Sequence, residues 1–157
     1  HHHMGRHVLH GEGSELMNDQ KKILELIKLA YDYGLDGMAK LEDIGLAAIC
    51  KVFNGTGPVW FPEVIRNAID KLSEVFLPAI MIHDVDFSYG EGTYEDFARA
   101  NNRLEYNMMT IADAECSWYN PMRYIRRRQA RLFAELCRAF GWIAYNKTCN
   151  YTKGTNK

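Results

Sequence analysis

The sequence predicts an all-α protein: a small helical domain built around a central antiparallel pair of helices. Apolar residues recur at the three- to four-residue spacing of a helix in several segments, and no segment shows a reliable strand-like alternation. Two of the helical segments flank a short Tyr-Gly-Glu-Gly turn at residues 89–92. A tight turn between two helices makes them antiparallel neighbours, which places this pair at the centre of the domain.

Composition divides the chain into three parts. Residues 1–16 begin with three histidines and include a Gly-Glu-Gly-Ser stretch, which is typical of an expression tag with its linker. Residues 17–146 carry the helical patterns and have the usual size of one domain. Residues 147–157 are polar, and we expect them to form a flexible tail.

The charge balance gives no whole-protein field that would attract the chain to nucleic acid or to an acidic membrane. When Arg6, Glu12 and Glu15 of the first part are set aside from the totals of 19 and 20, 18 basic and 18 acidic residues remain. No apolar run approaches the roughly 20 residues that cross a bilayer, so we expect no transmembrane segment. Without a signal peptide, we expect a cytoplasmic protein whose four cysteines are free thiols.

The helices are predicted in chain order from periodicity and capping residues. Segment 35–51 is apolar but short, and its pattern fits either a helix or a buried segment. Thr93 is expected to cap the helix that follows it, with Asp96 at capping-box distance. Helices are predicted over residues 19–33, 63–76, 78–90, 94–111 and 122–145.

The apolar run at residues 80–87 is interrupted by His83 and Asp84, and the rest of the chain is organised around this pair. Burying both groups requires hydrogen bonds, a partner charge or a metal ion. The pair is therefore either a core histidine held by its neighbours or a catalytic histidine beside a metal-binding carboxylate. If the hairpin folds back near residues 91–92, His83 lies opposite Ala100, and Asn101 and Asn102 are the polar residues that meet its imidazole.

One Gly-rich loop, residues 53–58, precedes the pair. Alternating glycines allow a backbone with positive φ that turns carbonyl or amide groups toward one point. The loop is either an ordinary turn or an ion-binding loop, and the pattern alone leaves both interpretations open.

The Gly-rich loop, the His-Asp helix, the Tyr-Gly turn and the antiparallel helix together resemble the phospholipase A2-like superfamily, in particular its short bacterial and phage-associated members. The resemblance covers about residues 53–108. It implies a calcium-dependent hydrolase of phospholipid esters, in which His83 takes a proton from the attacking water. The residues that it assigns to Ca²⁺ are Asp84, Gly55, Gly57 and Val59.

The sequence departs from that family at two positions near the histidine. Asn101 stands where the family has an orienting aspartate, and Phe87 stands where it has a supporting tyrosine. Asparagine fixes a histidine tautomer but does not stabilise an imidazolium. Either activity is weak, or another acid such as Asp86 or Glu105 substitutes, or the fold is kept without the reaction.

The alternative is a non-catalytic helical module, such as a phage or prophage accessory protein that binds a partner. A metal phosphohydrolase of the His-Asp domain class needs several histidine ligands, whereas residues 17–157 contain one histidine. A serine hydrolase is excluded by the lack of a Gly-x-Ser-x-Gly motif. The arginine-rich segment 123–131 is interpreted as a solvated face with salt bridges or, alternatively, as an anion-binding patch.

Overall fold

The computed structural model describes residues 20–53 and 74–155, and these form helices and turns without any strand, which confirms the all-α class. The predicted tag at residues 1–16 and most of the predicted helix 63–76 lie outside the described residues, and residues 74–76 form a turn. The helices span residues 20–33, Met38–Ile44 (α2), Leu46–Val52 (α3), Leu77–Ser88 (α5), Tyr94–Glu115 (α6), Pro121–Phe140 (α7) and Trp142–Thr155 (α8).

The central element is α5, which contacts α2, α3, α6 and α8. A helix that is apolar all round is stable only when other elements surround it, and the Leu-Pro-Ala-Ile-Met-Ile start of α5 is of this kind. Pro78 lies in its first turn, where the missing backbone N–H has no helical partner to lose. Asp84 is the one residue of α5 that is not buried, so the helix opens toward solvent at that position.

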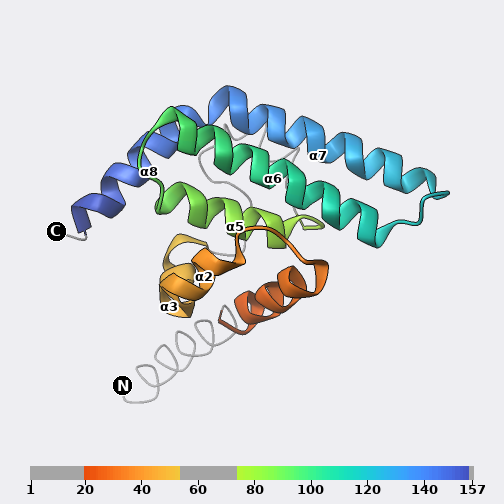
Figure 1. Cartoon of the computed structure of the whole chain (residues 1–157), viewed down its shortest axis with the longest axis horizontal. Helices are drawn as coiled ribbons and strands as arrows, with labels where there is room; N and C mark the ends of the chain where they lie inside the picture. Colours follow the sequence, from red (N-terminus) through yellow and green to blue (C-terminus); the bar gives the residue numbers. More distant parts are fainter. Residues whose placement is uncertain (1–19, 54–73, 156–157) are drawn as a thin grey trace, which may run out of the picture.

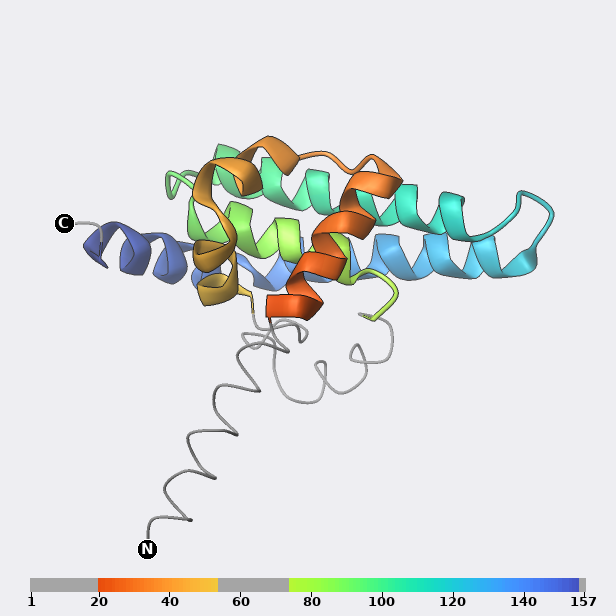
Figure 2. The ribbon, with the colours of Figure 1, turned by 90° about the horizontal axis from the view of Figure 1, so that it is seen from below.

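The long helix α6 lies between α5 and α7 and packs against both (Figure 1). The view from below shows α6 and α7 running alongside each other as a long hairpin, with the first helix and α2 across one face (Figure 2). The buried residues of α7 alternate in size, with Ala130 and Ala134 beside Phe133 and Cys137. The two alanines add little volume between the helices, which favours a close approach of α7 to α6.

The turn between α5 and α6 is held by side chains from both sides. The Thr93 hydroxyl accepts a hydrogen bond from the Asp96 backbone N–H at 3.2 Å, which confirms the predicted cap. Gly92 has a φ of +83°, a left-handed conformation that glycine adopts without strain. Its N–H donates to the Tyr145 hydroxyl at 3.1 Å, so α8 helps to fix the hairpin.

The turn after the first helix is fastened to α6 by a buried asparagine. The Asp36 N–H donates to Asn107 Oδ1 at 2.8 Å, and Asn107 Nδ2 donates to the Asp36 carbonyl at 2.9 Å. This pairing satisfies both backbone groups of a turn residue with one side chain. Asn107 is fully buried, so these hydrogen bonds are shielded from water.

Segment 35–51 and the C-terminal region differ from the prediction in detail. Segment 35–51 forms two short helices, α2 and α3, because Gly45 between them adopts a φ of +84°. The prediction of a single helix over residues 122–145 is wrong: α7 ends at Phe140, and after Gly141 the chain continues as α8. The tail expected from residue 147 is also helical up to Thr155, and Cys149 is buried.

An aromatic cluster explains the break at Gly141. Trp142 packs edge-on against Phe97 with ring centroids 5.4 Å apart, and Tyr145 packs edge-on against Phe87 at 5.1 Å. A straight continuation of α7 would carry these rings past α5 and α6, whereas the break brings them onto both helices. Aromatic pairs in this geometry add about 0.5–1.5 kcal/mol each beyond the burial of their area.

All four cysteines are free thiols in the described residues, as expected: Cys50, Cys116, Cys137 and Cys149. Within residues 20–53 and 74–155, no helix combines the length and the apolar character that a membrane span requires.

Candidate functional site around His83

His83 lies in the middle of α5 and faces α6. Its side chain is 3% exposed, and its Nε2 atom is 2.8 Å from Oδ1 of Asn101, which is fully buried. The predicted fold-back of the hairpin therefore identified Asn101 correctly as a residue that meets the imidazole. Asn102, the other candidate, points elsewhere and accepts a hydrogen bond from Arg138 at 2.9 Å.

This hydrogen bond fixes the histidine tautomer. An amide oxygen only accepts, so Nε2 carries the proton and donates it to Asn101 Oδ1. Burial lowers the pKa of His83 from 6.5 to about 4, and the hydrogen bond to Asn101 opposes that shift only in part. The ring is therefore neutral near pH 7, and Nδ1 is left as an unprotonated nitrogen that is able to take a proton.

Asp84 lies on the Nδ1 side of the ring. Its carboxylate oxygen Oδ1 is 4.0 Å from His83 Nδ1, too far for a hydrogen bond, and its side chain is 19% exposed. Burial raises the pKa of Asp84 from 3.8 to about 8. The solvent-accessible side of the site is therefore the side on which the unprotonated Nδ1 of His83 lies near the Asp84 carboxyl group.

Cys137 brings α7 to the same site. Burial raises the pKa of its thiol well above the usual range, and the negative charge of Asp84 raises it further. Cys137 is fully buried and therefore remains a neutral thiol rather than a nucleophilic thiolate. No local sequence pattern links Cys137 with Asp84, because the two residues are far apart in the chain.

Phe87 covers one face of the imidazole. Its ring centroid is 4.1 Å from that of His83 at an interplanar angle of 47°, one helical turn along α5. A phenylalanine here supplies packing but no hydroxyl group. The ring position is therefore held by packing against the tilted Phe87 ring and by the hydrogen bond to Asn101.

Asp86 and Glu105, the two acids that could replace an orienting carboxylate, both pair with arginines instead. Asp86 Oδ1 accepts a hydrogen bond from Arg103 at 2.8 Å, and Glu105 Oε2 accepts one from Arg138 at 2.8 Å. The orienting group at Nε2 is therefore the neutral amide of Asn101. Among residues 20–53 and 74–155, no hydrogen-bond partner contacts the buried Nδ2 atom of Asn101.

The predicted calcium site is only partly within the described residues. Gly55, Gly57 and Val59 lie outside them, and the described residues contain no group of three or more His, Cys, Asp or Glu side chains that could hold a metal. The Asp84 carboxyl group fits the role of one ligand. The group is partly exposed to solvent. Burial disfavours its ionised form, and a bound cation would stabilise that form.

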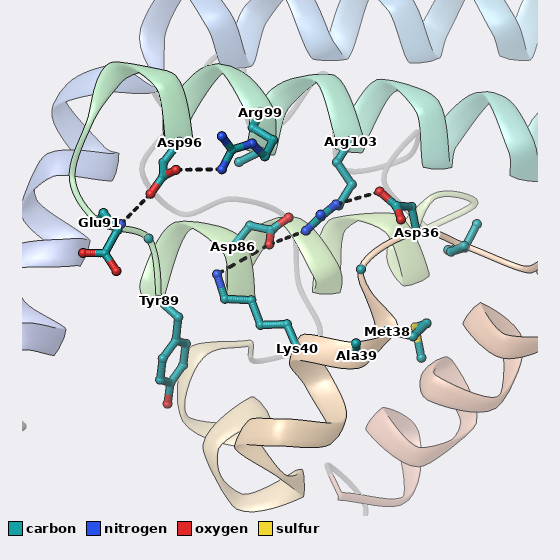
Figure 3. A pocket seen from close by; sticks show the side chains of 14 residues that line it. Asp36, Met38, Ala39, Lys40, Asp86, Tyr89, Glu91, Asp96, Arg99 and Arg103 are labelled. Atoms are coloured by element: carbon teal, nitrogen blue, oxygen red, sulfur yellow. Dashed lines mark hydrogen bonds and ion pairs between the residues drawn. The ribbon is translucent and has the colours of Figure 1, made fainter.

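A polar hollow of about 630 Å³ lies apart from His83, where α2 meets α5 and α6 (Figure 3). Arg103 bridges two carboxylates there, donating from Nε to Asp36 at 3.0 Å and from Nη1 to Asp86 at 2.8 Å. Lys40 Nζ is 3.9 Å from Asp86. Together with the Asn107 pairing, this network ties the turn before α2 to α5 and α6, and we interpret it as structural.

The arginine-rich segment of α7 forms the predicted salt bridges in its first part. Arg123 Nε and Arg127 Nη1 each donate to Asp113 of α6, at 2.9 and 2.7 Å. These hydrogen bonds hold the pKa of the Asp113 carboxyl group below its ordinary value, although partial burial opposes them. The segment continues beyond these pairs to the exposed Arg128 and Arg131.

No protein-family model matches the chain, and neither a curated protein nor a solved structure matches it. The function must therefore be inferred from the site itself.

Proposed function

We propose that the protein is a calcium-dependent hydrolase of phospholipid esters, with His83 as the general base. The observation that carries the proposal is the hydrogen bond from His83 Nε2 to Asn101 Oδ1, because it leaves Nδ1 unprotonated beside Asp84. Core packing alone does not require an unprotonated Nδ1 at this place. Nδ1 lies beside Asp84, which is the one residue of α5 that is not buried.

In this proposal His83 moves one proton twice. Nδ1 takes a proton from a water molecule as the water oxygen attacks the ester carbonyl carbon. The same proton then passes to the departing alcohol oxygen when the ester C–O bond breaks, which returns His83 to its neutral form. Asn101 keeps Nε2 protonated throughout, so that Nδ1 is the nitrogen that takes up and releases the transferred proton.

Asp84 would hold the calcium ion together with main-chain carbonyl groups, for which the resemblance to the phospholipase A2-like superfamily implies Gly55, Gly57 and Val59. A bound calcium ion polarises an ester carbonyl and stabilises the negative charge that develops on its oxygen. Asp84 itself neither donates nor accepts the transferred proton. Its Oδ1 atom lies 4.0 Å from Nδ1, so a cation held by Asp84 would lie on the same side of α5 as the base.

The rate is expected to be low for two reasons, which concern His83 and its partner Asn101. A base with a pKa of about 4 takes a proton less readily than an ordinary imidazole. Asn101 also provides no negative charge for the imidazolium that forms, and loss of the corresponding charge in serine proteases lowers kcat about 10⁴-fold.

The test is hydrolysis of a short-chain phosphatidylcholine that stays monomeric, followed by titration of the released acid. The wild-type chain with calcium should release acid above background, and EGTA should stop it. His83→Gln should lower the rate at least about 10²-fold, the usual contribution of a general base, with an unchanged circular dichroism spectrum.

A matched control is Asn102→Ala, which changes a neighbouring asparagine that does not meet the imidazole. It should keep the wild-type rate. Calcium-dependent hydrolysis that survives His83→Gln would contradict the proposal. A wild-type chain without turnover would favour the non-catalytic module, for which the neutral amide at position 101 is the structural reason.

A further inference from the structure

One stretch of the chain combines many arginines with no acid. Residues 116–134 contain five arginines and no aspartate, glutamate or lysine. This stretch covers the turn after α6 and most of α7, and the next carboxylate along the chain is Glu135. Two of the arginines pair with Asp113 of α6, and Arg128 and Arg131 lie farther along α7 with exposed side chains.

The same outer face of α7 carries exposed apolar side chains. Tyr124 is 71% exposed, Ile125 is 45% exposed and Leu132 is 59% exposed. Together with Arg128 they line a hollow of about 300 Å³ on the outside of the helix. The inner face of α7, with Phe133 and the alanines, already packs on α6, so α7 has apolar residues on two sides.

The turn before α7 adds two aromatic residues at the far end of the α6–α7 hairpin (Figure 1). Trp118 and Tyr119 are 83% and 73% exposed, and their rings contact each other edge-on at 5.7 Å. A second hollow, of about 340 Å³, runs from these rings to Tyr124, which also lines the first hollow. The aromatic tip and the arginine-bearing face are therefore one continuous surface.

Charge decides which partner fits this surface. A second copy of the chain that docked by the same face would bring its arginines against these arginines, without any acid between residues 116 and 134 to pair with them. Nucleic acid would satisfy the arginines but would leave Ile125 and Leu132 in water. An anionic lipid surface satisfies both kinds of side chain, because its head groups pair with arginine and its acyl boundary accepts apolar groups.

We propose that the outer face of α7 and the Trp118–Tyr119 tip bind the surface of an anionic phospholipid bilayer. Indole and phenol rings lie preferentially at the level of the head groups, where one end of the ring is apolar and the other end is wet. Arginine stems lie along the apolar boundary while their guanidinium groups reach the phosphates. The helix lies flat on the surface and does not enter the membrane. This binding does not involve His83 and is independent of the proposed hydrolysis.

The experiment is co-sedimentation of the full chain with vesicles of phosphatidylglycerol and phosphatidylcholine in equal parts, with EGTA present. The variant Arg128→Gln/Arg131→Gln should lower the partition coefficient about 30-fold, the equivalent of about 2 kcal/mol at about 1 kcal/mol per surface cation. The control Lys28→Gln/Arg99→Gln removes the same charge from exposed positions on other helices and should bind as the wild type does.

The apolar part of the surface has its own variant. Trp118→Ala/Tyr119→Ala should weaken binding at unchanged net charge, and its effect should persist at high salt, whereas that of the arginine variant should fade. His83→Gln should bind vesicles normally, which separates this proposal from the proposed hydrolysis.

Three outcomes would overturn the proposal: no vesicle binding by the wild type, equal binding to pure phosphatidylcholine vesicles, or equal losses in the arginine variant and its control. Tighter binding to duplex DNA than to vesicles would also overturn it and would identify nucleic acid as the partner. Dimerisation that Arg128→Gln/Arg131→Gln strengthens would identify a second copy instead.

Discussion

Replacing Asp84 by asparagine should stabilise the calcium-free fold, although it removes an ionisable residue from the proposed site. Burial raises the pKa of Asp84 to about 8, whereas the same carboxyl group in the unfolded chain has the ordinary value of 3.8. The folded chain therefore holds a proton on Asp84 that the unfolded chain gives up. Stability contributed by this group is present at low pH and is lost as the pH rises from 3.8 to about 8.

The magnitude follows from the distance between the two pKa values. At pH 7 the solution lies about 3 pH units above the unfolded pKa, and each unit corresponds to about 1.4 kcal/mol, so Asp84 costs the fold about 4 kcal/mol. This is an upper value, because the side chain is 19% exposed and water remains within reach. Asparagine keeps the shape of aspartate without the charge, so Asp84→Asn should recover most of that free energy.

His83 gives the opposite slope over part of the range. Its pKa falls from 6.5 unfolded to about 4 folded, so its contribution to stability is lost as the pH drops from 6.5 to about 4. The slopes from His83 and Asp84 oppose each other between pH 4 and 6.5, and only the Asp84 slope remains above pH 6.5. We expect the difference between Asp84→Asn and wild type to grow steadily from about pH 4 to about pH 8.

The assay is urea unfolding in EGTA at several pH values, followed by circular dichroism. The control is Asp113→Asn, since the arginines around Asp113 lower the pKa of its carboxyl group, and that replacement should destabilise the fold. If Asp84→Asn were less stable than wild type near pH 8, Asp84 would have a stabilising partner in the calcium-free chain, and the reasoning would be refuted.

Two further predictions concern buried amides. Asn101→Asp places a carboxylate at His83 Nε2, which should raise the His83 pKa above 4 and increase any hydrolytic rate. The pKa can be measured by NMR from the C2 proton of His83 in a chain that lacks residues 1–16. An unchanged pKa would contradict the contact between the two side chains. Asn107→Ala leaves both backbone groups of Asp36 without partners, at a cost of about 2–4 kcal/mol in the free energy of unfolding. Thr110→Ala, at a more exposed position on α6, is its control and should stay within about 0.5 kcal/mol of wild type.

Much of the helical core could be predicted from sequence because its signals are local. The hairpin was predictable from the apolar periodicity on either side of a Gly-containing turn, and its symmetry led directly to Asn101 opposite His83. The Thr93 cap was predictable for the same reason, since a capping residue lies next to the backbone groups that it satisfies.

The features that could not be predicted depend on residues that are distant in sequence. Gly141 has a backbone conformation that is compatible with a helix, so its local geometry does not mark the end of α7. The helix ends there because Trp142 and Tyr145 pack on α5 and α6. Arg103 and Asp36 meet across 67 residues, and a charged pair of this kind has no periodic signal. The raised pKa of Asp84 likewise follows from tertiary burial, which no short motif records.

The measurement that tests the central claim most directly is a calorimetric calcium titration at pH 7, repeated in buffers with different heats of ionisation. If calcium binds to Asp84, it must displace the proton that this carboxyl group holds, and the titration should show saturable binding with release of close to one proton. Asp84→Asn should abolish both the binding and the proton release. Binding that persists unchanged in Asp84→Asn, or no saturable binding by the wild-type chain, would contradict the assignment of a calcium site beside His83.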